Sequence, residues 1–414
     1  MKQAVDDAHR REWAGVLAAT VRVTRDIDLA EECVQDAYAK ALTSWRTDGI
    51  PAKPGAWLTT VARRRAIDLL RRERALARRL PLLVDDLGDR WDDPQAFGTP
   101  DDAAPIADDR LRLIFTCCHP ALAPETRVAL TLRLVCGLTT PEVARAFLVS
   151  EATMAARITR GKKKIQAARI PYRMPAAADL PDRLQSVLAA THLVFTTGHT
   201  APAGGQLMRA DLTERAIDLA RMLRMMLPAR PDVAGLLALF LLTDARRASR
   251  LGEDGALIRL ADQDRDRWDR TAIVEGRALV AEALRAGRPG RFTLMAAIAA
   301  VHAEATSWTE TDWSEIVGLY DILTVEWPSP VVALNRAVAV GFAAGPKAGL
   351  DALDALRDEP RLAGYGYFAS ARAELLRDLG RVTEARVAYD EALLLTENEV
   401  EAAFLRRRMS ELPS

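Results

Sequence analysis

Apolar residues recur at the spacing of an α-helix along most of the chain, and this pattern predicts an all-α protein. Segments of alternating β-branched residues, which are typical of strands, are lacking. In the second half the pattern predicts helices at 209–227, 232–249, 269–286, 293–305, 313–326 and 330–342. Between them lie turn-forming sequences such as GEDG, GRPGR and WPSP. The whole chain is therefore expected to be helical.

Residues 137–165 carry the pattern of two short helices joined by a tight turn. Thr140 is placed to cap the first helix, and Pro141 follows where a missing backbone donor costs nothing. Ser150 is placed to cap the second helix. The inward-facing positions of the second helix are Met154, Ile158 and Ile165. Its other faces are cationic, which suits a major groove lined by phosphates. The segment predicts a helix-turn-helix, and the alternative is an ordinary basic surface helix.

A second basic segment, residues 54–79, combines an apolar stripe with an arginine-rich face. The stripe consists of Leu58, Val61, Ala62, Ala66 and Leu69, and the opposite face carries Arg63, Arg64, Arg71 and Arg74. Asp68 and Glu73 are the acidic residues of the segment. A face of one sign suits a phosphate backbone, and Trp57 is placed to stack on an unpaired base. A core position for Trp57 is the alternative.

The segment before it, residues 26–45, predicts an amphipathic helix with an acidic outer face. One face holds Leu29, Cys33, Ala37 and Ala41, and outside it lie Glu31, Glu32, Gln35 and Asp36. An acidic face repels phosphates. We therefore expect this helix to bind a protein rather than DNA.

The order of these segments resembles that of a bacterial RNA polymerase sigma factor of the extracytoplasmic-function (ECF) class. Residues 28–36 (DLAEECVQD) resemble region 2.2 of the family, which grips the coiled coil of the polymerase β′ subunit. Residues 57–72 resemble regions 2.3 and 2.4, which melt and read the −10 element. Residues 46–55 correspond to the segment that captures a flipped non-template base. Residues 137–165 resemble region 4, which reads the −35 element.

The resemblance implies three groups of site residues. The group for core polymerase is Asp28, Glu31, Glu32, Gln35 and Asp36. The group for the −10 element is Lys53, Trp57, Arg63, Arg64, Arg71 and Arg72. The group for the −35 element is Thr153, Arg157, Thr159, Arg160, Lys162 and Lys163. The implied partners are promoter DNA and core polymerase with its β′ and β subunits. No cofactor or metal is expected, and no catalytic residue, because RNA synthesis belongs to the polymerase.

The chain departs from the family pattern at two places. Arg64 stands where the family often carries Asn. Ala155 and Ala156 stand where it often carries polar or basic residues, and alanine cannot donate to a base edge. Readout of the −35 element would then depend on Arg157, Thr159 and Arg160, or on DNA shape.

The distribution of charge supports a modular chain of 414 residues whose net charge is zero. Residues 1–82 carry a net +5, residues 83–109 carry −8, residues 110–173 carry +9 and the remainder carries −6. We expect these blocks to be region 2, an acidic flexible linker, region 4, and a C-terminal extension over residues 174–414. The linker either mimics nucleic acid or is a solvated spacer.

Signals for other classes of protein are weak. Cys117 and Cys118 are adjacent and lack the spacing of a zinc site, so core packing is favoured over redox sensing or metal binding. Motifs of P-loop NTPases, HExxH metalloproteases and GxSxG hydrolases are absent. Neither a signal peptide nor an apolar run of membrane-spanning length is visible, so a cytoplasmic protein without membrane contact is expected.

The C-terminal extension contains a candidate tetratricopeptide-like repeat at residues 366–397. Its small and aromatic positions are Ala373, Leu376, Gly380, Ala385, Tyr389 and Ala392. They fit two antiparallel helices that nest closely, and such arrays offer grooves to a protein or peptide partner. A generic helical bundle is the alternative. The layout resembles the ECF subgroup with a long repeat-containing extension that is thought to regulate the sigma factor.

Two functions remain open at this point. The first is a sigma factor that directs promoter-specific initiation and is modulated by its own extension. The second is a helix-turn-helix regulator, independent of polymerase, with a helical-repeat sensor. Residues 28–36 favour the first, because a regulator that acts alone has no use for them.

Overall fold

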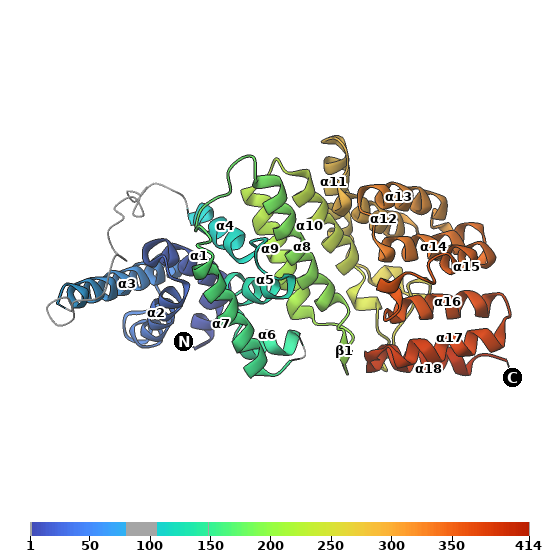
Figure 1. Cartoon of the computed structure of the whole chain (residues 1–414), viewed down its shortest axis with the longest axis horizontal. Helices are drawn as coiled ribbons and strands as arrows, with labels where there is room; N and C mark the ends of the chain where they lie inside the picture. Colours follow the sequence, from blue (N-terminus) through green and yellow to red (C-terminus); the bar gives the residue numbers. More distant parts are fainter. Residues whose placement is uncertain (1, 80–105, 148, 414) are drawn as a thin grey trace. The chain divides into compact units, whose positions relative to one another are not determined.

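The computed structural model describes residues 2–79, 106–147 and 149–413 of the chain. Most of these residues are in helices and very few are in strands, which confirms the predicted all-α class (Figure 1). The structure divides into two compact units, Met1–Ala190 and Thr191–Ser414. The expected linker, residues 83–109, lies outside the described residues except for its last few, which begin a helix. Within the described part, none of the helices has both the length and the apolar character that a bilayer crossing requires.

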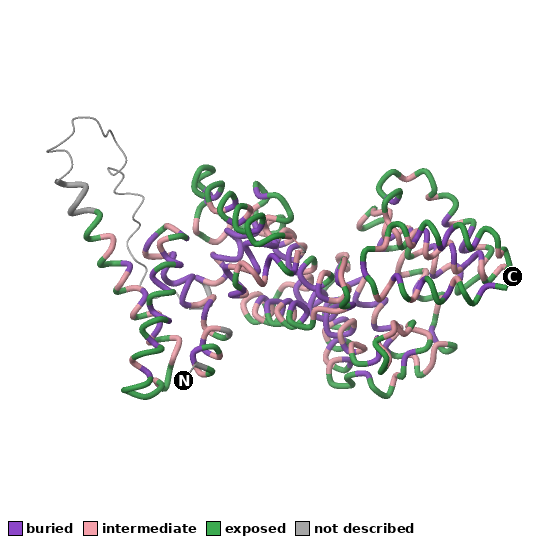
Figure 2. The backbone as a smooth tube through the Cα atoms, turned by 90° about the horizontal axis from the view of Figure 1, so that it is seen from below, coloured by how far each residue is buried: buried purple, intermediate pink, exposed green. Residues whose placement is uncertain are grey.

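The first unit begins with a bundle of three helices, α1 (Lys2–Thr24), α2 (Ile27–Asp48) and α3 (Pro54–Arg79). Asp26 caps α2 by accepting a 3.0 Å hydrogen bond from the Leu29 backbone N–H. Gly49, with a positive φ of 84°, ends the helix. Fully buried alanines on α2 and α3 let the helices approach closely. Along α3 buried, intermediate and exposed positions alternate, as the stripe in the sequence predicts (Figure 2).

The second part of this unit contains the helix-turn-helix. Its elements are α4 (Ile106–Cys117), α5 (Pro124–Leu130), the π-helix η3 (Thr131–Val135), α6 (Thr140–Ala146) and α7 (Glu151–Ala167). Ser150 caps α7 as predicted. The cap of α6 is Thr139 rather than Thr140, because Thr139 and Glu142 close a capping box. Met154, Ile158 and Ile165 are buried, as their spacing predicts. The long helix α8 (Leu180–His199) then crosses the boundary between the units.

The second unit is a succession of paired helices. They are α9 (Ala210–Met226), α10 (Pro231–Asp244), α11 (Arg270–Arg285), α12 (Arg291–Glu304), α13 (Trp313–Glu326), α14 (Pro330–Ala344), α15 (Pro346–Asp354), α16 (Gly366–Asp378), α17 (Val382–Leu394) and α18 (Glu399–Ser410). Short 3-10 turns lie at Arg247–Ser249, Leu260–Asp262, Arg265–Arg267, Trp308–Glu310 and Pro360–Leu362. The helix boundaries follow the predicted ranges closely.

The predicted repeat is the helical hairpin of α16 and α17. Ala373, Leu376, Ala385, Tyr389 and Ala392 are all fully buried in its core. Gly380 makes the turn with a positive φ of 72°. In the hairpin before it, α14 and α15, Gly341 and Gly349 bring the two backbones close together.

A short parallel strand pair, which the sequence pattern did not predict, closes this unit. Strand β1 (Ala203–Gly204) pairs with β2 (Glu397–Asn398). The buried Asn398 donates to the carbonyl oxygens of Ala201 and Gln206, each at 2.9 Å. These bonds join the start of the unit to its last helical hairpin.

The close approach of α14 and α15 can be tested with Gly349→Ala. The added Cβ would lie 2.6 Å from Gly341 Cα, where neither backbone can easily move. We expect the free energy of unfolding to fall by about 1–3 kcal/mol, as measured by urea denaturation followed by circular dichroism. Gly318→Ala in α13 is the control, since its new Cβ meets nothing within 4 Å. The Gly318→Ala variant should have the same free energy of unfolding as the original protein or a higher one. Equal free energies for the two variants would contradict the close packing of α14 and α15.

Candidate nucleic-acid and protein interfaces

Helix α7 presents most of the predicted −35 residues to solvent. The exposed ones are Thr153, Thr159, Arg160 and Lys163. Arg157 is half-buried, with its guanidinium carbon 5.4 Å from the centre of the Phe147 ring. A cation stacked on a ring keeps its outer edge free for hydrogen bonds. These five residues form a cationic, hydrogen-bonding surface of the kind that DNA requires.

Lys162 differs from the other predicted −35 residues because it is paired within the protein. Its Nζ lies 2.7 Å from an Asp28 carboxylate oxygen and also contacts Glu31. Its side chain is only 12% exposed. Burial lowers the pKa of Lys162, but the attraction of Glu31 and Asp28 prevails and raises it above its ordinary value. Lys162 is therefore a charged member of an internal ion-pair cluster in this structure.

Helix α3 carries most of the predicted −10 residues. Lys53, just before the helix, is exposed, as are Arg64, Arg71 and Arg72, while Arg63 is half-buried. Trp57 lies partly in the core, and its stacking on an unpaired base stays a prediction. It packs edge-on against the buried Trp45, with ring centres 5.6 Å apart, and it remains partly accessible.

The predicted polymerase-binding residues of α2 fall into two groups. Asp28, Glu32, Gln35 and Asp36 are exposed. The placement of Glu31 on the outer face was wrong, because its side chain is only 6% exposed. Asp36 is 2.9 Å from the Arg65 guanidinium of α3, an exposed pair of small energetic value.

Two residues that the sequence did not single out complete the surroundings of Glu31. Arg133, from the π-helix η3, lies 2.7 Å from a Glu31 carboxylate oxygen. Trp13 of α1 is buried beside it and donates from its indole N–H to the Leu134 carbonyl at 3.1 Å. The Arg133 guanidinium also lies over the Trp13 ring, 5.5 Å from its centre. In the sequence, the one sign that Arg133 pairs inside the protein is its position as a lone arginine within the apolar run LTLRLVCG.

The cysteines are free thiols. Cys33, Cys117 and Cys118 are buried, and Cys136 is partly exposed. Burial raises the pKa of Cys33 and of Cys118 to about 11 and that of Cys117 well above its ordinary value. Core packing, the favoured interpretation, agrees with this placement. Among the described residues, no group of potential ligands could hold a metal ion.

Family models match three segments of the chain. The model for Sigma-70 region 2 matches residues 9–76, and the model for Sigma-70, region 4 matches residues 112–165. A third match, a family of unknown function (DUF6596), covers residues 183–284. No solved structure matches the chain.

Two kinds of relative were found. An uncharacterized protein of Rhizobium meliloti (strain 1021) is 44% identical over 397 residues, which is 96% of this chain and 93% of that protein. The ECF RNA polymerase sigma factor SigK of Mycobacterium sp. (strain KMS) is 32% identical over 155 residues, which is 36% of this chain and 75% of that protein. SigK of Mycobacterium ulcerans (strain Agy99) is 32% identical over 147 residues, which is 34% of this chain and 73% of that protein.

A helical protein with an acidic helix, an arginine-faced helix and a helix-turn-helix, in this order, has the parts of a transcription initiation factor. The matches to family models and relatives identify the class of initiation factor. The chain belongs to the ECF RNA polymerase sigma factors and carries a long helical C-terminal extension. The residues assigned to each interface remain predictions.

The thiol environments predict one reactive cysteine. At about pH 8, Ellman's reagent should modify Cys136 in the native protein. The buried thiols should react only after denaturation, since their raised pKa leaves little thiolate. Cys136→Ser should abolish the native reaction. Rapid modification of two or more thiols in that variant would revive a redox role for Cys117 and Cys118.

Proposed function

We propose that this sigma factor divides its work among three helices. The exposed carboxylates of α2 bind core polymerase, the arginine face of α3 holds the melted −10 strand, and α7 reads the −35 duplex. The separation of charge carries this proposal: acidic residues are exposed on α2, whereas cationic residues are exposed on α3 and α7. Phosphates would be repelled by the first surface and attracted by the other two.

The proposed −35 surface reads few bases directly. Ala155 and Ala156 are both exposed on α7, where they can offer only apolar contact, for example to a thymine methyl group. Arg157 and Arg160 are the long donors next to them. Discrimination would therefore depend on these two arginines and on DNA shape.

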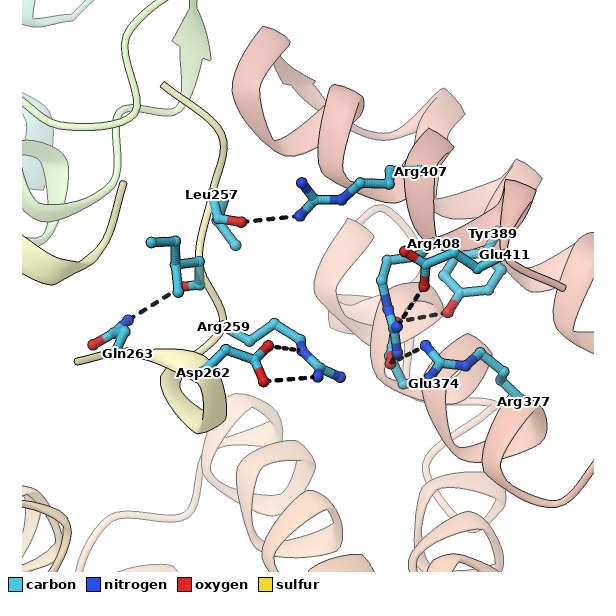
Figure 3. Close-up of polar contacts among 11 residues, drawn as sticks. Leu257, Arg259, Asp262, Gln263, Glu374, Arg377, Tyr389, Arg407, Arg408 and Glu411 are labelled. Carbon is cyan, nitrogen blue, oxygen red and sulfur yellow. Dashed lines mark hydrogen bonds and ion pairs between the residues drawn. The ribbon is translucent and has the colours of Figure 1, made fainter. Parts of the chain in front are cut away.

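The C-terminal unit is proposed to modulate initiation by binding a protein or peptide. A groove of about 410 Å³ lies between residues 252–262 and α18 and adjoins a second of about 390 Å³. Its walls are fixed by ion pairs: Arg259 bonds Asp262 at 2.7 Å, and Arg408 bonds Glu411 at 2.8 Å (Figure 3). Arg407 donates to the Leu257 carbonyl at 3.2 Å and is exposed, so it can also meet an acidic group of a partner.

Loss of the two α7 arginines tests the −35 assignment. We expect Arg157→Ala with Arg160→Ala to reduce transcription from a −35-dependent promoter about tenfold or more. Binding to core polymerase in the absence of DNA should stay unchanged. The salt dependence of promoter binding should also weaken, by about two units of its logarithmic slope.

A matched control is Arg267→Ala with Arg285→Ala, which removes the same charge from exposed positions of the second unit. This variant should transcribe as the original protein does. Loss of core binding in the α7 variant would count against the assignment, and so would an equal loss of transcription in both variants.

The role of the C-terminal unit can be tested by run-off transcription with core polymerase and a promoter pool. We expect the full chain and a chain ending at Arg173 to differ in transcript yield by about tenfold, or about 1.4 kcal/mol. A higher yield from the short chain identifies the extension as an inhibitor. A higher yield from the full chain makes it part of the initiating assembly, and equal yields contradict modulation.

A further inference from the structure

The turn that follows α10 in the second unit carries two arginines that form no ion pair in the described part of the chain. Arg250 is only 7% exposed. Its guanidinium donates to the His199 carbonyl oxygen and, at 3.1 Å, to Thr200 Oγ1. Arg246 is half-buried, and its guanidinium has no hydrogen-bond partner among the described residues. Two cations are therefore withdrawn from water without a bonded counter-charge.

The carboxylates near this turn are bonded to other residues. Arg247, between the two arginines, pairs with Asp244 at 2.7 Å. The carboxylates that attract Arg250 from a distance are Asp244 and Glu401. Glu401 accepts a 2.7 Å hydrogen bond from the Tyr367 hydroxyl. Neither carboxylate forms an ion pair with the two arginines, which keep donor groups for another acceptor.

Two neutral histidines lie beside the same arginines. His199 ends α8, and His302 lies in the last turn of α12. Burial and the charges of Arg250 and Arg246 hold the pKa of His199 well below its ordinary value. Burial and the charge of Arg246 lower the pKa of His302 to about 4. Each ring therefore offers one N–H donor near neutral pH without adding a charge.

A third arginine, Arg265, reaches the end of α12. Its Nη1 donates to the carbonyl oxygens of His302 and Ala305, at 2.6 and 2.7 Å. Its Nη2 is buried without a hydrogen-bond partner, and so is His302 Nδ1. Such atoms are rare in native proteins because they are costly, so a ligand with several oxygens that reached them would be favoured. We call the following residues the arginine junction: His199, Arg246, Arg250, Arg265 and His302.

Hydrogen bonds hold the segments of the arginine junction together. Trp268 donates from Nε1 to Ser249 Oγ at 2.8 Å, and Ser249 Oγ lies 2.9 Å from the Arg246 carbonyl oxygen. The Asp269 backbone N–H donates to the Ala245 carbonyl oxygen at 2.9 Å. The turn with the two arginines is therefore fixed before a ligand arrives, which reduces the entropic cost of binding.

We propose that the arginine junction binds the phosphate group of a small molecule, with Arg246 and Arg250 holding its oxygens. Guanidinium groups form strong, charge-assisted hydrogen bonds to phosphate. A phosphate fits better than a carboxylate, because its oxygens can accept from several guanidiniums, whereas one carboxylate fills a single guanidinium fork. None of these residues lines the groove described above, so the small molecule is additional to the proposed protein or peptide partner.

Isothermal titration calorimetry of the full chain tests the proposal with three probes: inorganic phosphate, adenosine monophosphate (AMP) and acetate. We expect phosphate to bind once per chain and acetate to bind about tenfold more weakly or not at all. Arg246→Gln should weaken phosphate binding about tenfold, since it removes a cation that has no other partner. Arg246→Lys, which keeps the charge, should bind phosphate better than Arg246→Gln does. The control, Arg267→Gln, removes an exposed charge of the same unit and should bind as the original protein does.

Thermal melting, followed by circular dichroism, separates a binding role of Arg246 from a structural one. Without ligand, Arg246→Gln should melt at the temperature of the original protein or above it, because it removes a partly buried charge that nothing neutralises. Phosphate should raise the melting temperature of the original protein and of the Arg267→Gln control. It should have a smaller effect on Arg246→Gln.

The proposal fails if neither phosphate nor AMP gives saturable binding to the original protein up to about 10 mM. It also fails if Arg246→Gln binds phosphate as the original protein does, because the exposed cations of α3 and α7 would then be the site. Acetate binding as tight as that of phosphate would contradict the assignment to phosphate.

The affinity of AMP distinguishes two sources of the phosphate group, and either result supports the site if binding is weakened in Arg246→Gln. Tighter binding of AMP than of inorganic phosphate identifies a phosphorylated ring compound. Trp308, whose ring centre is 6.4 Å from that of His302, offers such a ring a stacking partner. Equal or weaker binding of AMP identifies the free ion.

Discussion

The burial of one carboxylate, that of Glu31, constrains the arrangement of the first unit. A charge that is only 6% exposed must be neutralised locally, and the cations that neutralise it come from two elements distant in sequence, η3 and α7. The helix that carries the predicted polymerase contacts is thereby tied to the helix that carries the predicted −35 contacts. Trp13 strengthens the tie by an indole hydrogen bond to the backbone of η3. Charge and packing thus act at the same place.

The second unit depends on a different constraint, the close approach of helix backbones. Glycine and alanine at facing positions, Gly341 and Gly349 above all, let paired helices nest without large side chains between them. Helical repeats make mostly local contacts, so their ends are their weak points. Here Asn398 joins the last hairpin to the start of the unit through two backbone carbonyls. In the C-terminal groove, Arg259 and Asp262 pair within one wall, and Arg407 of α18 donates a hydrogen bond to the Leu257 carbonyl of that wall.

The charged clusters of the second unit illustrate how the same residue types serve packing and binding. Arg247 pairs with Asp244 at 2.7 Å and with Glu214 at 2.9 Å, so these charges tie parts of the unit together. On α7 exposed cations without such ties remain available to phosphates. A charged residue is tied or available according to whether the fold places a residue of opposite charge next to it. The linear order of residues does not reveal this. A protein of zero net charge can therefore still present surfaces of strong and opposite sign.

The sequence by itself determined the helical class, most helix boundaries, the two caps and buried positions of the helix-turn-helix to within one residue, and the repeat hairpin. All of these follow from local periodicity and capping, which act over a few residues. Only the tertiary structure decided that Glu31 is buried, that Lys162 is paired, and that Arg133 and Trp13 join two parts of one unit. These features depend on contacts between residues more than a hundred positions apart, such as Trp13 with Leu134 and Glu31 with Lys162. Periodicity shows which face of a helix is apolar, but the partner of that helix decides which of its charges are removed from water.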